Sequence, residues 1–454
     1  MKVCKFGGTS VASAEQIKKV AAIVQNDPSR KIIVVSAPGK RFTGDIKVTD
    51  LLIELGRVSL AGEKIEVPLA EVVERYSQIA EELNLGPSII HAIQTDLQMR
   101  LSADKNNYKM YMDQIIASGE DNSAKLLSAY FLSIGLQAKY LNPKDAGLIV
   151  NDLPERAQAL AESYNNLAVL KNTEEIIVFP GFFGFTKNET LRTFDRGGSD
   201  ITGSILAAAL NAELYENFTD VDCVFAANPH IVANPIEIEE MTYREMRELS
   251  YAGFSVLHDE ALMPAYKASV PVCIKNTNHP AAVGTMIVKE RDYSKKPVTG
   301  ISADSGFSTL YVSKYLMNRE LGFGRKLLQI LEDEEVSYEH IPSGIDNLSV
   351  IIRSHQLTPE KEVRIIQRIQ IELNADDVHI RSDFSMVVLV GEGMNNTVGL
   401  AARAASAIAR TGANIEMINQ GSSEVSLVFG VMKQDEIKIL KELYQEFFET
   451  ALVK

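Results

Sequence analysis

The feature that most constrains the fold is the alternation, over residues 1–292, of short continuous apolar runs with amphipathic stretches. Residues 31–35 and 176–179 are such runs, which are typical of parallel strands covered on both faces. Before the first of them an apolar stripe begins at Ile17, and Ser13 before it has a glutamine three positions later, the spacing of a helix capping box. This pattern predicts an α/β unit with a mainly parallel sheet.

One long segment of this unit departs from the alternation. Residues 60–117 lack strand-like runs and are rich in helix formers, which predicts a helical insertion. The pattern then turns polar at residues 293–297, where we place a domain boundary.

The remainder of the chain repeats itself. Residues 341–344 match residues 418–421 at an offset of 418 − 341 = 77 positions, and the register holds on both sides. Each copy reads strand, helix, strand, strand, helix, which is the plan of a small ferredoxin-like α+β module. The repeat predicts two such modules, at 300–376 and 377–454; two unrelated α+β pieces are the alternative.

Composition excludes several classes of function. The chain has 46 Lys+Arg and 60 Asp+Glu, a net charge of −14, which disfavours nucleic acid or an anionic membrane surface as a partner. No apolar run approaches the roughly 18 residues that span a bilayer, and glycines follow Lys5 where a signal peptide would need an apolar core. Three widely spaced cysteines show no disulfide or metal pattern, so we expect a cytoplasmic protein.

A first glycine pair follows the first predicted strand, in the run Lys-Phe-Gly-Gly-Thr-Ser at 5–10. Adjacent glycines let backbone N–H groups approach a phosphate, and Lys5 adds a full positive charge beside a helix start. The run therefore predicts an anion cradle, with a plain tight turn as the alternative. It is neither a Walker A loop nor a dinucleotide fingerprint, and the protein-kinase motifs are missing.

A second glycine pair lies in Asp-Arg-Gly-Gly-Ser-Asp at 195–200, between a predicted strand and an apolar helix. Arg196 offers a planar fork that suits a carboxylate, and Asp200 suits either Lys5 or a metal-bound water. A carboxylate that only neutralises the helix start is the alternative for Asp200.

Three further polar positions are weak signals when taken alone. Glu120 follows Ser-Gly at an expected helix start, and Thr49 is placed to cap the next helix. The run Thr-Asp-Val-Asp at 219–222 follows a strand, where its carboxylates suit a ribose or Mg²⁺, or form a simple Asx turn.

Taken together, these motifs resemble the aspartate kinases of the amino acid kinase superfamily over almost the whole chain, and the C-terminal repeat resembles that family's pair of ACT modules. The resemblance implies a three-layer α/β amino acid kinase fold followed by two ferredoxin-like ACT modules. It also implies the ATP-dependent phosphorylation of the β-carboxylate of L-aspartate to 4-phospho-L-aspartate, the first step of lysine, threonine and methionine synthesis. At 454 residues we expect no fused dehydrogenase.

The resemblance also assigns roles to residues of this chain. Lys5 becomes the cation that stabilises the phosphate, and Asp200 organises it. The residues expected to hold aspartate are Thr49, Glu120, Arg196, Gly198 and Ser199. The residues expected to line the ATP site are Lys5, Gly7, Gly8, Thr219, Asp220, Phe225, His230, Ser255 and Val256. Mg²⁺ would come with ATP, and no protein side chain is assigned as its ligand. Because the attacking β-carboxylate is already ionised at neutral pH, no general base is required.

The chain departs from the family pattern around the nucleotide. Phe225 and His230 stand where the family often has tyrosine and arginine, and Ser255 stands where a lysine is usual. Two phosphate-directed cations are therefore missing, so ATP binds more weakly or a neighbour such as Lys267 or Lys275 replaces them.

The first ACT-like copy carries the expected effector site. Its residues are Met317, Glu320, Phe323, Gly324, Ser337, Tyr338 and Glu339, and an ordinary glycine turn is the alternative. We expect lysine, threonine or both as inhibitors, and a homodimer or dimer of dimers through the ACT modules. Two rival functions remain open: another amino acid kinase of the glutamate 5-kinase type, and a catalytically silent amino acid sensor.

Overall fold

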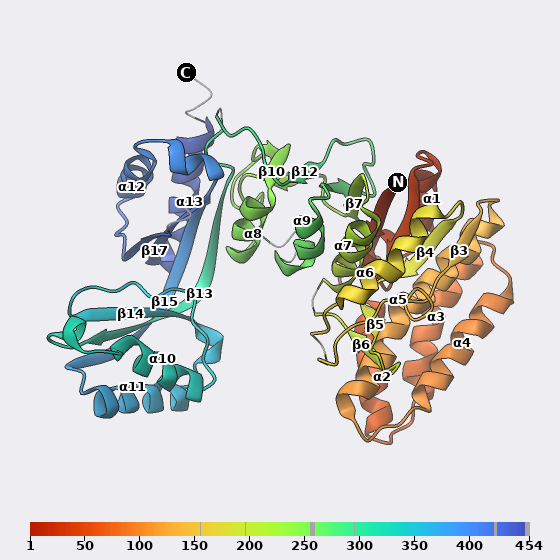
Figure 1. The fold of residues 1–454 in the computed structure, drawn as a ribbon, viewed down its shortest axis with the longest axis horizontal. Coiled ribbons are helices and arrows are strands. Elements are labelled where there is room, and N and C mark those ends of the chain that lie inside the picture. Colours follow the sequence, from red (N-terminus) through yellow and green to blue (C-terminus); the bar gives the residue numbers. More distant parts are fainter. Residues whose placement is uncertain (155, 196, 255–258, 295, 422–424, 450–454) are drawn as a thin grey trace. The chain divides into compact units, whose positions relative to one another are not determined.

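The structure, a computed structural model, describes residues 1–154, 156–195, 197–254, 259–294, 296–421 and 425–449. The described chain divides into two compact units, and Figure 1 shows the elements of each. The first unit contains Met1–Val224, Glu237–Arg247 and Ser255–Arg291, and the second contains Phe225–Ile236, Glu248–Phe254 and Asp292–Lys454. Two short segments of the predicted 1–292 unit thus group with the C-terminal part of the chain.

The first unit is built on a mainly parallel sheet, as predicted. Over the described residues it has eight strands in the order β10-β12-β11-β7-β1-β2-β4-β3, and the β11–β12 pair is antiparallel. These strands are β1 (Lys2–Phe6), β2 (Arg30–Val35), β3 (Ala138–Tyr140), β4 (Ile176–Pro180), β7 (Leu214–Thr219), β10 (Glu240–Thr242), β11 (Val272–Asn276) and β12 (Thr285–Val288). The shorter strands are β5 (Phe183–Phe185), β6 (Leu191–Thr193), β8 (Val224–Phe225) and β9 (Glu237–Ile238).

Helices cover both faces of this sheet. They are α1 (Ala14–Gln25), α2 (Val48–Leu60), α3 (Glu66–Glu82), α4 (Pro87–Leu101), α5 (Tyr108–Ser133), α6 (Ala161–Leu167), α7 (Gly198–Leu210), α8 (Tyr243–Tyr251) and α9 (Met263–Ala268). Because side chains alternate along a strand, Phe6 and Val35 pack toward α1 and α5, whereas Lys5 faces α7. The unit therefore has three layers, with the sheet in the middle.

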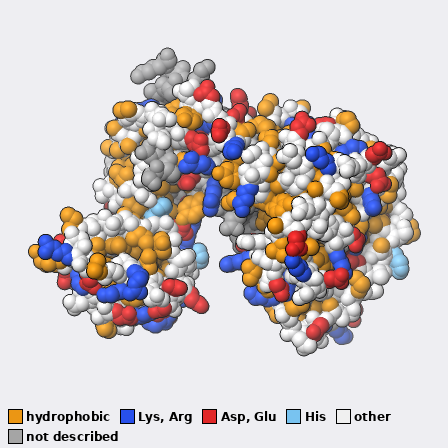
Figure 2. Space-filling model, viewed as in Figure 1, with side chains coloured by type: hydrophobic (Ala, Val, Ile, Leu, Met, Phe, Trp, Pro, Cys, Tyr) orange, Lys and Arg blue, Asp and Glu red, His pale blue; other side chains and the backbone are white. Residues whose placement is uncertain are grey.

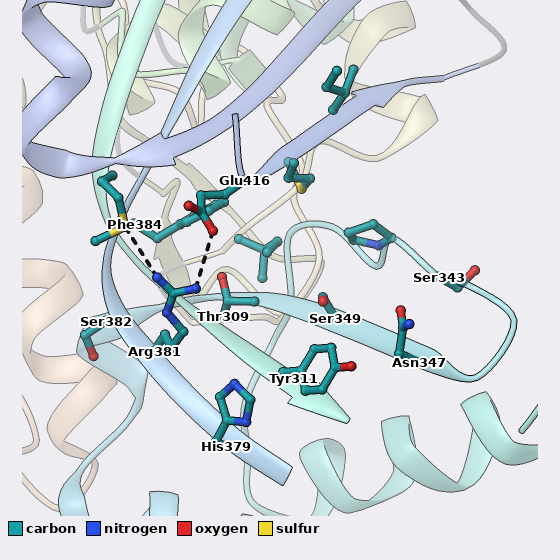
Figure 3. A pocket seen from close by; sticks show the side chains of 16 residues that line it. Thr309, Tyr311, Ser343, Asn347, Ser349, His379, Arg381, Ser382, Phe384 and Glu416 are labelled. Carbon is teal, nitrogen blue, oxygen red and sulfur yellow. Dashed lines mark hydrogen bonds and ion pairs between the residues drawn. The ribbon is translucent and has the colours of Figure 1, made fainter. Parts of the chain in front are cut away.

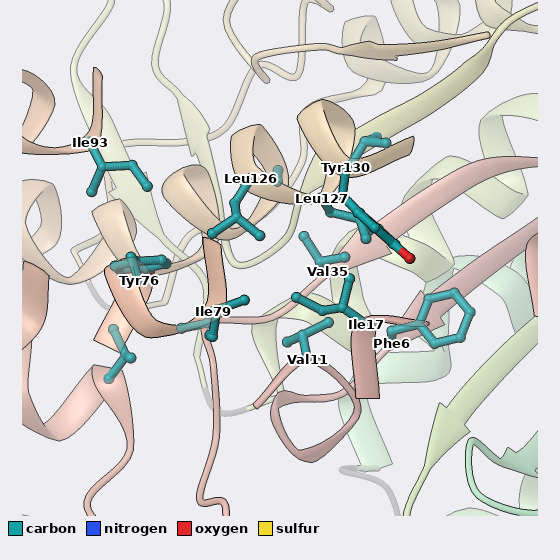
Figure 4. Packing of buried hydrophobic residues seen from close by; sticks show 14 of the residues in the cluster. Phe6, Val11, Ile17, Val35, Tyr76, Ile79, Ile93, Leu126, Leu127 and Tyr130 are labelled. Carbon is teal, nitrogen blue, oxygen red and sulfur yellow. The ribbon is translucent and has the colours of Figure 1, made fainter. Parts of the chain in front are cut away.

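One apolar core of this unit lies beneath the long helices. Figure 4 shows Phe6 and Val35 of the sheet packed with Ile79 of α3 and Leu127 of α5. The predicted insertion at 60–117 corresponds to helices, but its end lies inside α5, which runs on to Ser133. The helix runs on through the buried polar stretch at 118–123, and Gly119 within it does not end the helix.

The second unit has a sheet of five strands among the described residues, all antiparallel, in the order β14-β13-β15-β17-β16. The strands are β13 (Gly300–Ser313), β14 (Asn347–Arg353), β15 (Asp377–Val390), β16 (Met417–Gln420) and β17 (Ser426–Met432), and the helices are α10 (Phe323–Asp333), α11 (Pro359–Leu373), α12 (Leu400–Arg410) and α13 (Glu436–Tyr444).

The predicted repeat is present in the elements themselves. The strands β13 and β15 start 377 − 300 = 77 residues apart, and the helices α10 and α12 start 400 − 323 = 77 residues apart. In the first copy the segment before β14 makes only isolated bridges, at His340 and Ser343, where the second copy has β16. Pro342 lies between these bridges, and its missing N–H interrupts a ladder.

The two copies share their long strands. The second half of β13, from Phe307, pairs with β14, whereas the second half of β15, from Phe384, pairs with β17. The β13–β15 ladder shifts register around Gly306, which has φ +90°. Each copy thus completes its sheet with half of a strand from the other, so limits at 376 and 377 cut through one continuous sheet. Among the described residues no helix is long and apolar enough to cross a lipid bilayer.

Candidate active site

Lys5 and Asp200 form a buried ion pair in the first unit. Lys5 is near the carboxyl end of β1, and Asp200 is in the first turn of α7. Lys5 Nζ lies 2.6 Å from Asp200 Oδ1, and the two side chains are 10% and 13% exposed. Gly197, with φ +76°, lets the chain turn sharply into the helix. Removing two charges from water is costly, and such pairs are typical of sites where the charge has a chemical use.

Two further side chains, from β7, hold the same turn of α7. The strands β7 and β1 are parallel, with Asn217 directly opposite Lys5. Asn217 Nδ2 donates to Asp200 Oδ1 at 2.8 Å, and the Tyr215 hydroxyl donates to the main-chain oxygen of Asp200 at 3.2 Å. The sequence analysis missed both residues. The available signal was an amide in the middle of a strand that is otherwise buried.

The first glycine pair is pinned between two neighbouring segments. The Gly7 N–H donates to the Phe218 carbonyl at 3.0 Å, and the Gly39 N–H donates to the Gly8 carbonyl at 2.8 Å. A Cβ on Gly39 would lie 2.6 Å from the carbonyl carbon of Gly8, so the two backbones touch. The loop after β1 is therefore held firmly beside Lys5, as an anion cradle requires.

The helix that follows this loop begins where the capping box predicted, and a short turn separates it from the glycine pair. Gly8–Val11 form a short 3₁₀ turn, and α1 starts only at Ala14. Ser13 caps α1 by accepting from the Gln16 N–H at 3.4 Å, as the capping box predicted. Because the field of a helix falls off within its first turn, the positive groups beside Gly7 and Gly8 are backbone N–H groups and Lys5 rather than α1.

Glu120 lies in the middle of α5, not at a helix start, so its interpretation as a dipole partner is wrong. Burial raises the pKa of Glu120 to about 7, against the opposing effects of the Ala37 N–H and of the Lys5 charge. Its Oε2 has no hydrogen-bond partner among the described residues. A Cβ on Gly119 would lie 2.8 Å from the Ala37 side chain, so a glycine is needed for this close approach. Glu120 is thus a buried acid with an unused oxygen that feels the charge of Lys5.

The other predicted aspartate-binding residues lie on separate elements. Thr49 is half-buried inside α2, and the N-cap of that helix is Lys47, so the capping role expected for Thr49 is wrong. Gly198 and Ser199 open α7, immediately before Asp200. Ser199 packs against Gly181, where a Cβ would lie 2.5 Å from its Oγ. Arg196 lies outside the described residues.

Thr219 ends β7 and Asp220 follows it, at the same edge of the sheet as the carboxyl end of β1. The Thr219 hydroxyl donates to Asp220 Oδ1 at 3.3 Å. Asp222 is occupied within the protein, because Asn276 and His279 both bond to its Oδ1, at 2.7 and 2.9 Å. These bonds lower the pKa of Asp222 and leave this carboxylate less available to a nucleotide or metal.

The remaining predicted nucleotide residues fall outside the first unit or outside the described residues. Phe225 and His230 belong to the second unit, and Ser255 and Val256 lie outside the described residues. Among described residues, no group of three or more His, Cys, Asp and Glu is arranged to hold a metal ion.

Two lysines were predicted as possible replacement cations, and Lys275 is the one on a strand next to β7. It is half-buried on β11, opposite Phe218 of β7 and one residue before the level of Thr219. Lys267, on α9, lines a cavity of about 720 Å³ together with Ile201 and Ile205 of α7.

The predicted effector residues separate into two groups. Met317 and Phe323 belong to the apolar core of the first ACT-like copy. Glu320 pairs with Lys314 and Lys326, and these hydrogen bonds lower the pKa of Glu320.

Glu339 and its neighbours form the second group. Glu339 accepts from Arg353 Nε at 3.2 Å. The Ser337 hydroxyl donates to Gln356 at 2.9 Å, and the Tyr338 side chain is exposed. A Cβ added at Gly324 would meet nothing within 4 Å, so the start of α10 is open there.

A separate cavity of about 350 Å³ lies on the second unit, where residues of both copies meet. Figure 3 shows Arg381 bonded to Glu416, at 3.3 Å, with His379 beside Tyr311. In Figure 2 hydrophobic side chains gather over β14 and charged ones over α10 and α11. The sequence analysis did not predict this cavity.

Comparison with known proteins agrees with the arrangement of both units. Residues 1–276 match the amino acid kinase family, and residues 387–447 match the ACT domain. The chain is 55% identical over 453 residues to aspartokinase 3 of Bacillus subtilis (strain 168), with 100% of both sequences covered.

Two solved structures share the fold. The aspartate kinase of Clostridium acetobutylicum has a TM-score of 0.87 and 36% identity, covering 98% of this chain and 100% of that one. Escherichia coli aspartokinase III, in complex with aspartate and ADP, has a TM-score of 0.79 and 24% identity, covering 99% of this chain and 100% of that one.

Proposed function

The chain belongs to the aspartokinases of the amino acid kinase family, and from this premise we propose that it transfers the γ-phosphoryl group of ATP to the β-carboxylate of L-aspartate. The product is 4-phospho-L-aspartate, which feeds lysine, threonine and methionine synthesis. The observation that carries the proposal is the buried Lys5–Asp200 pair, which lies beside Gly7 and whose lysine charge acts on the pKa of Glu120.

The chemistry of this transfer asks for charge stabilisation rather than proton transfer. The β-carboxylate of aspartate has a pKa near 3.9 in its unperturbed state, so it attacks as the anion without a general base. Lys5 neutralises charge on the transferred phosphoryl oxygens, and Asp200 holds the Lys5 ammonium in place. Orientation of the two substrates in line supplies the rest of the rate enhancement.

The aspartate site needs one anion and one cation from the protein. Glu120 receives the α-ammonium, because it is a buried carboxyl with an unpartnered oxygen. An ammonium beside it favours the ionised form, so aspartate binding near pH 7 releases the proton that burial keeps on Glu120. Arg196 pairs with a substrate carboxylate, and Thr49, Gly198 and Ser199 complete the site.

ATP lies along the edge formed by the carboxyl ends of β1 and β7. Gly8 donates its backbone N–H to the phosphates, and Gly7, whose own N–H is bonded to Phe218, lets the backbone approach them. Thr219 and Asp220 contact the nucleoside. Phe225, His230, Ser255 and Val256 complete this site in the proposal. Lys275 replaces a cation that this chain lacks.

Mg²⁺ arrives with ATP. Mg²⁺ in such sites is held mainly by phosphate oxygens and water, with one or two carboxylates at most, so the proposal needs no larger group of acidic side chains. When bound, Mg²⁺ would neutralise negative charge on the phosphate oxygens of ATP.

The ACT modules form the regulatory part of the enzyme, and an end-product amino acid, lysine or threonine or both, binds the first copy. The sheet order leaves β14 and β16 at its edges, which favours association of sheets into a homodimer or a dimer of dimers. Steady-state rates with lysine and threonine, alone and together, test the effector, and sedimentation with and without effector tests the assembly. Free, buried cysteines are consistent with a cytoplasmic enzyme.

A direct test follows the products. Purified protein should release ADP with aspartate and form an acyl phosphate that hydroxylamine traps in equal amount. Faster turnover with glutamate than with aspartate would favour the rival kinase. Nucleotide binding without any turnover would favour the silent sensor.

A further inference from the structure

Asn217 is a polar side chain in a place that normally holds an apolar one. It lies in the middle of β7, is 1% exposed, and is flanked along the strand by the side chains of Glu216 and Phe218. A buried amide is unfavourable unless its polar atoms are hydrogen-bonded. Its bonding partners therefore indicate why the amide is there.

The amide makes a long contact, 3.5 Å, with the Tyr215 hydroxyl and a much shorter one with Asp200. Asn217 Nδ2 lies 2.8 Å from Asp200 Oδ1, the same atom that lies 2.6 Å from Lys5 Nζ. Because β1 and β7 are parallel and Lys5 is directly opposite Asn217, both donors rise from the same face of the sheet toward α7. The carboxylate of Asp200 is thus held from two sides.

We propose that Asn217 is a positioning residue, which fixes the orientation of the Asp200 carboxylate and through it the place of the Lys5 ammonium. The lysine side chain is long and flexible, so its charge is only as well placed as the group that holds it. Without the amide donor, the carboxylate is free to turn about its terminal bond. The inference rests on the proposed roles of Lys5 and Asp200.

The other contacts of this site explain why the amide is not redundant. Tyr215 holds the main-chain oxygen of Asp200 and so fixes the start of α7, but it does not touch the carboxylate oxygens. From β11 the residue opposite Asn217 is Ile274, which is apolar. The charged groups that face Asn217 are therefore Lys5 from β1 and Asp200 from α7, with the neutral Tyr215 phenol on β7 itself.

A matched pair of variants separates positioning from simple loss of stability. Asn122 of α5 is also fully buried, and its amide also donates to a carboxylate, that of Asp96, at 3.1 Å. We expect Asn217→Leu to lower kcat by roughly ten- to a hundredfold, since it removes a bond to a charged group, with KM for aspartate and ATP changed less than about threefold. Asn122→Leu should lower the unfolding midpoint by a similar amount and leave kcat within about twofold.

A second pair of variants tests the pH dependence of kcat, which a purely structural role of Asn217 would leave unchanged. In Asn217→Asp two carboxylates face each other, so kcat relative to the wild type should be low at pH 8 and should recover as the pH falls and the new acid regains a proton to donate. Asn122→Asp should follow the wild-type pH profile.

Three outcomes would overturn the inference: wild-type kcat in Asn217→Leu, equal losses in the two leucine variants, or an Asn217→Asp profile parallel to the wild type. Lys5→Met, assayed beside them, keeps the hypotheses apart. Full activity in Lys5→Met would remove the proposed role of Lys5 itself, whereas an inactive Lys5→Met with a fully active Asn217→Leu would remove only the role of Asn217.

Discussion

The catalytic and regulatory units hold their carboxylates in opposite ways. In the first unit, Asp200 is buried with Lys5 and Asn217, and burial raises the pKa of Glu120. In the second unit, Glu320 is 27% exposed, and hydrogen bonds from Lys314 and Lys326 lower its pKa. Buried charges interact strongly and keep one geometry, whereas exposed pairs exchange partners at little cost. Buried charges of fixed geometry suit a site that stabilises a transition state. Exposed pairs that exchange partners suit a site that a ligand must open.

The largest expected effect comes from removing Lys5, the cation proposed to stabilise the phosphoryl group. Lys5→Met should lower kcat by roughly a thousandfold or more, because preorganised charge at the reacting phosphoryl group has no substitute in water. ADP release coupled to aspartate measures it. A matched change of the exposed pair, Lys326→Met in α10, should leave kcat without effector within about twofold. Comparable losses in both variants would contradict the contrast between the two units.

A second effect concerns Glu120, whose carboxylate is proposed to bind aspartate and is expected to destabilise the folded protein at alkaline pH. Glu120→Gln should raise KM for aspartate by roughly a hundredfold, since the α-ammonium loses its counter-charge. The same change should stabilise the folded protein at alkaline pH.

The direction of that stability effect follows from the raised pKa of Glu120. The folded pKa of about 7 lies above the ordinary 4.5, so the folded state binds more protons than the unfolded state between these values. The free energy of unfolding of the wild type therefore falls as the pH rises from 4.5 to 7. At pH 8 the glutamine variant should be more stable by up to about 3 kcal/mol, converging with the wild type near pH 4.5. Urea unfolding at both pH values is the check, and a less stable variant at pH 8 would contradict it.

A third, smaller effect compares two helix glycines. A Cβ on Gly203 of α7 would lie 2.5 Å from the Tyr215 hydroxyl, whereas one on Gly324 of α10 would meet nothing within 4 Å. Gly203→Ala should therefore cost about 1–3 kcal/mol of stability and lower kcat several-fold, because α7 must move away from Tyr215 and carry Asp200 with it. Gly324→Ala should add about 0.5–1 kcal/mol. Thermal unfolding of both variants measures the difference, and equal shifts would contradict the close packing of α7.

The smallest effect is expected at the exposed pair. Glu320→Gln should leave kcat without effector unchanged and shift the inhibitory concentration of lysine or threonine by about two- to tenfold, because Lys314 and Lys326 lose their shared partner. Inhibition curves for both amino acids measure it. Inhibition identical to the wild type would remove Glu320 from the effector site.

Much of the fold followed from short-range patterns. The apolar runs predicted β2 and β4, the capping box predicted the start of α1 at Ser13, and the 77-residue offset matched both the long strands and the first helices of the two copies. Glu120 shows the limit of such patterns. A Ser-Gly pair usually marks a boundary, but here Gly119 lies inside a helix because Ala37 of another segment packs against it.

The sequence by itself determined which groups are candidates for the chemistry and where the chain changes from an α/β unit to a repeat, since spacing, glycine pairs and periodicity act within a few residues of the chain. Only the tertiary structure decided that Asn217 meets Asp200, that Glu120 is buried beside Lys5, and that β13 and β15 each serve both ACT-like copies. Those outcomes depend on strand order and register, which join residues as far apart as Lys5 and Asn217 and leave no trace in the local pattern.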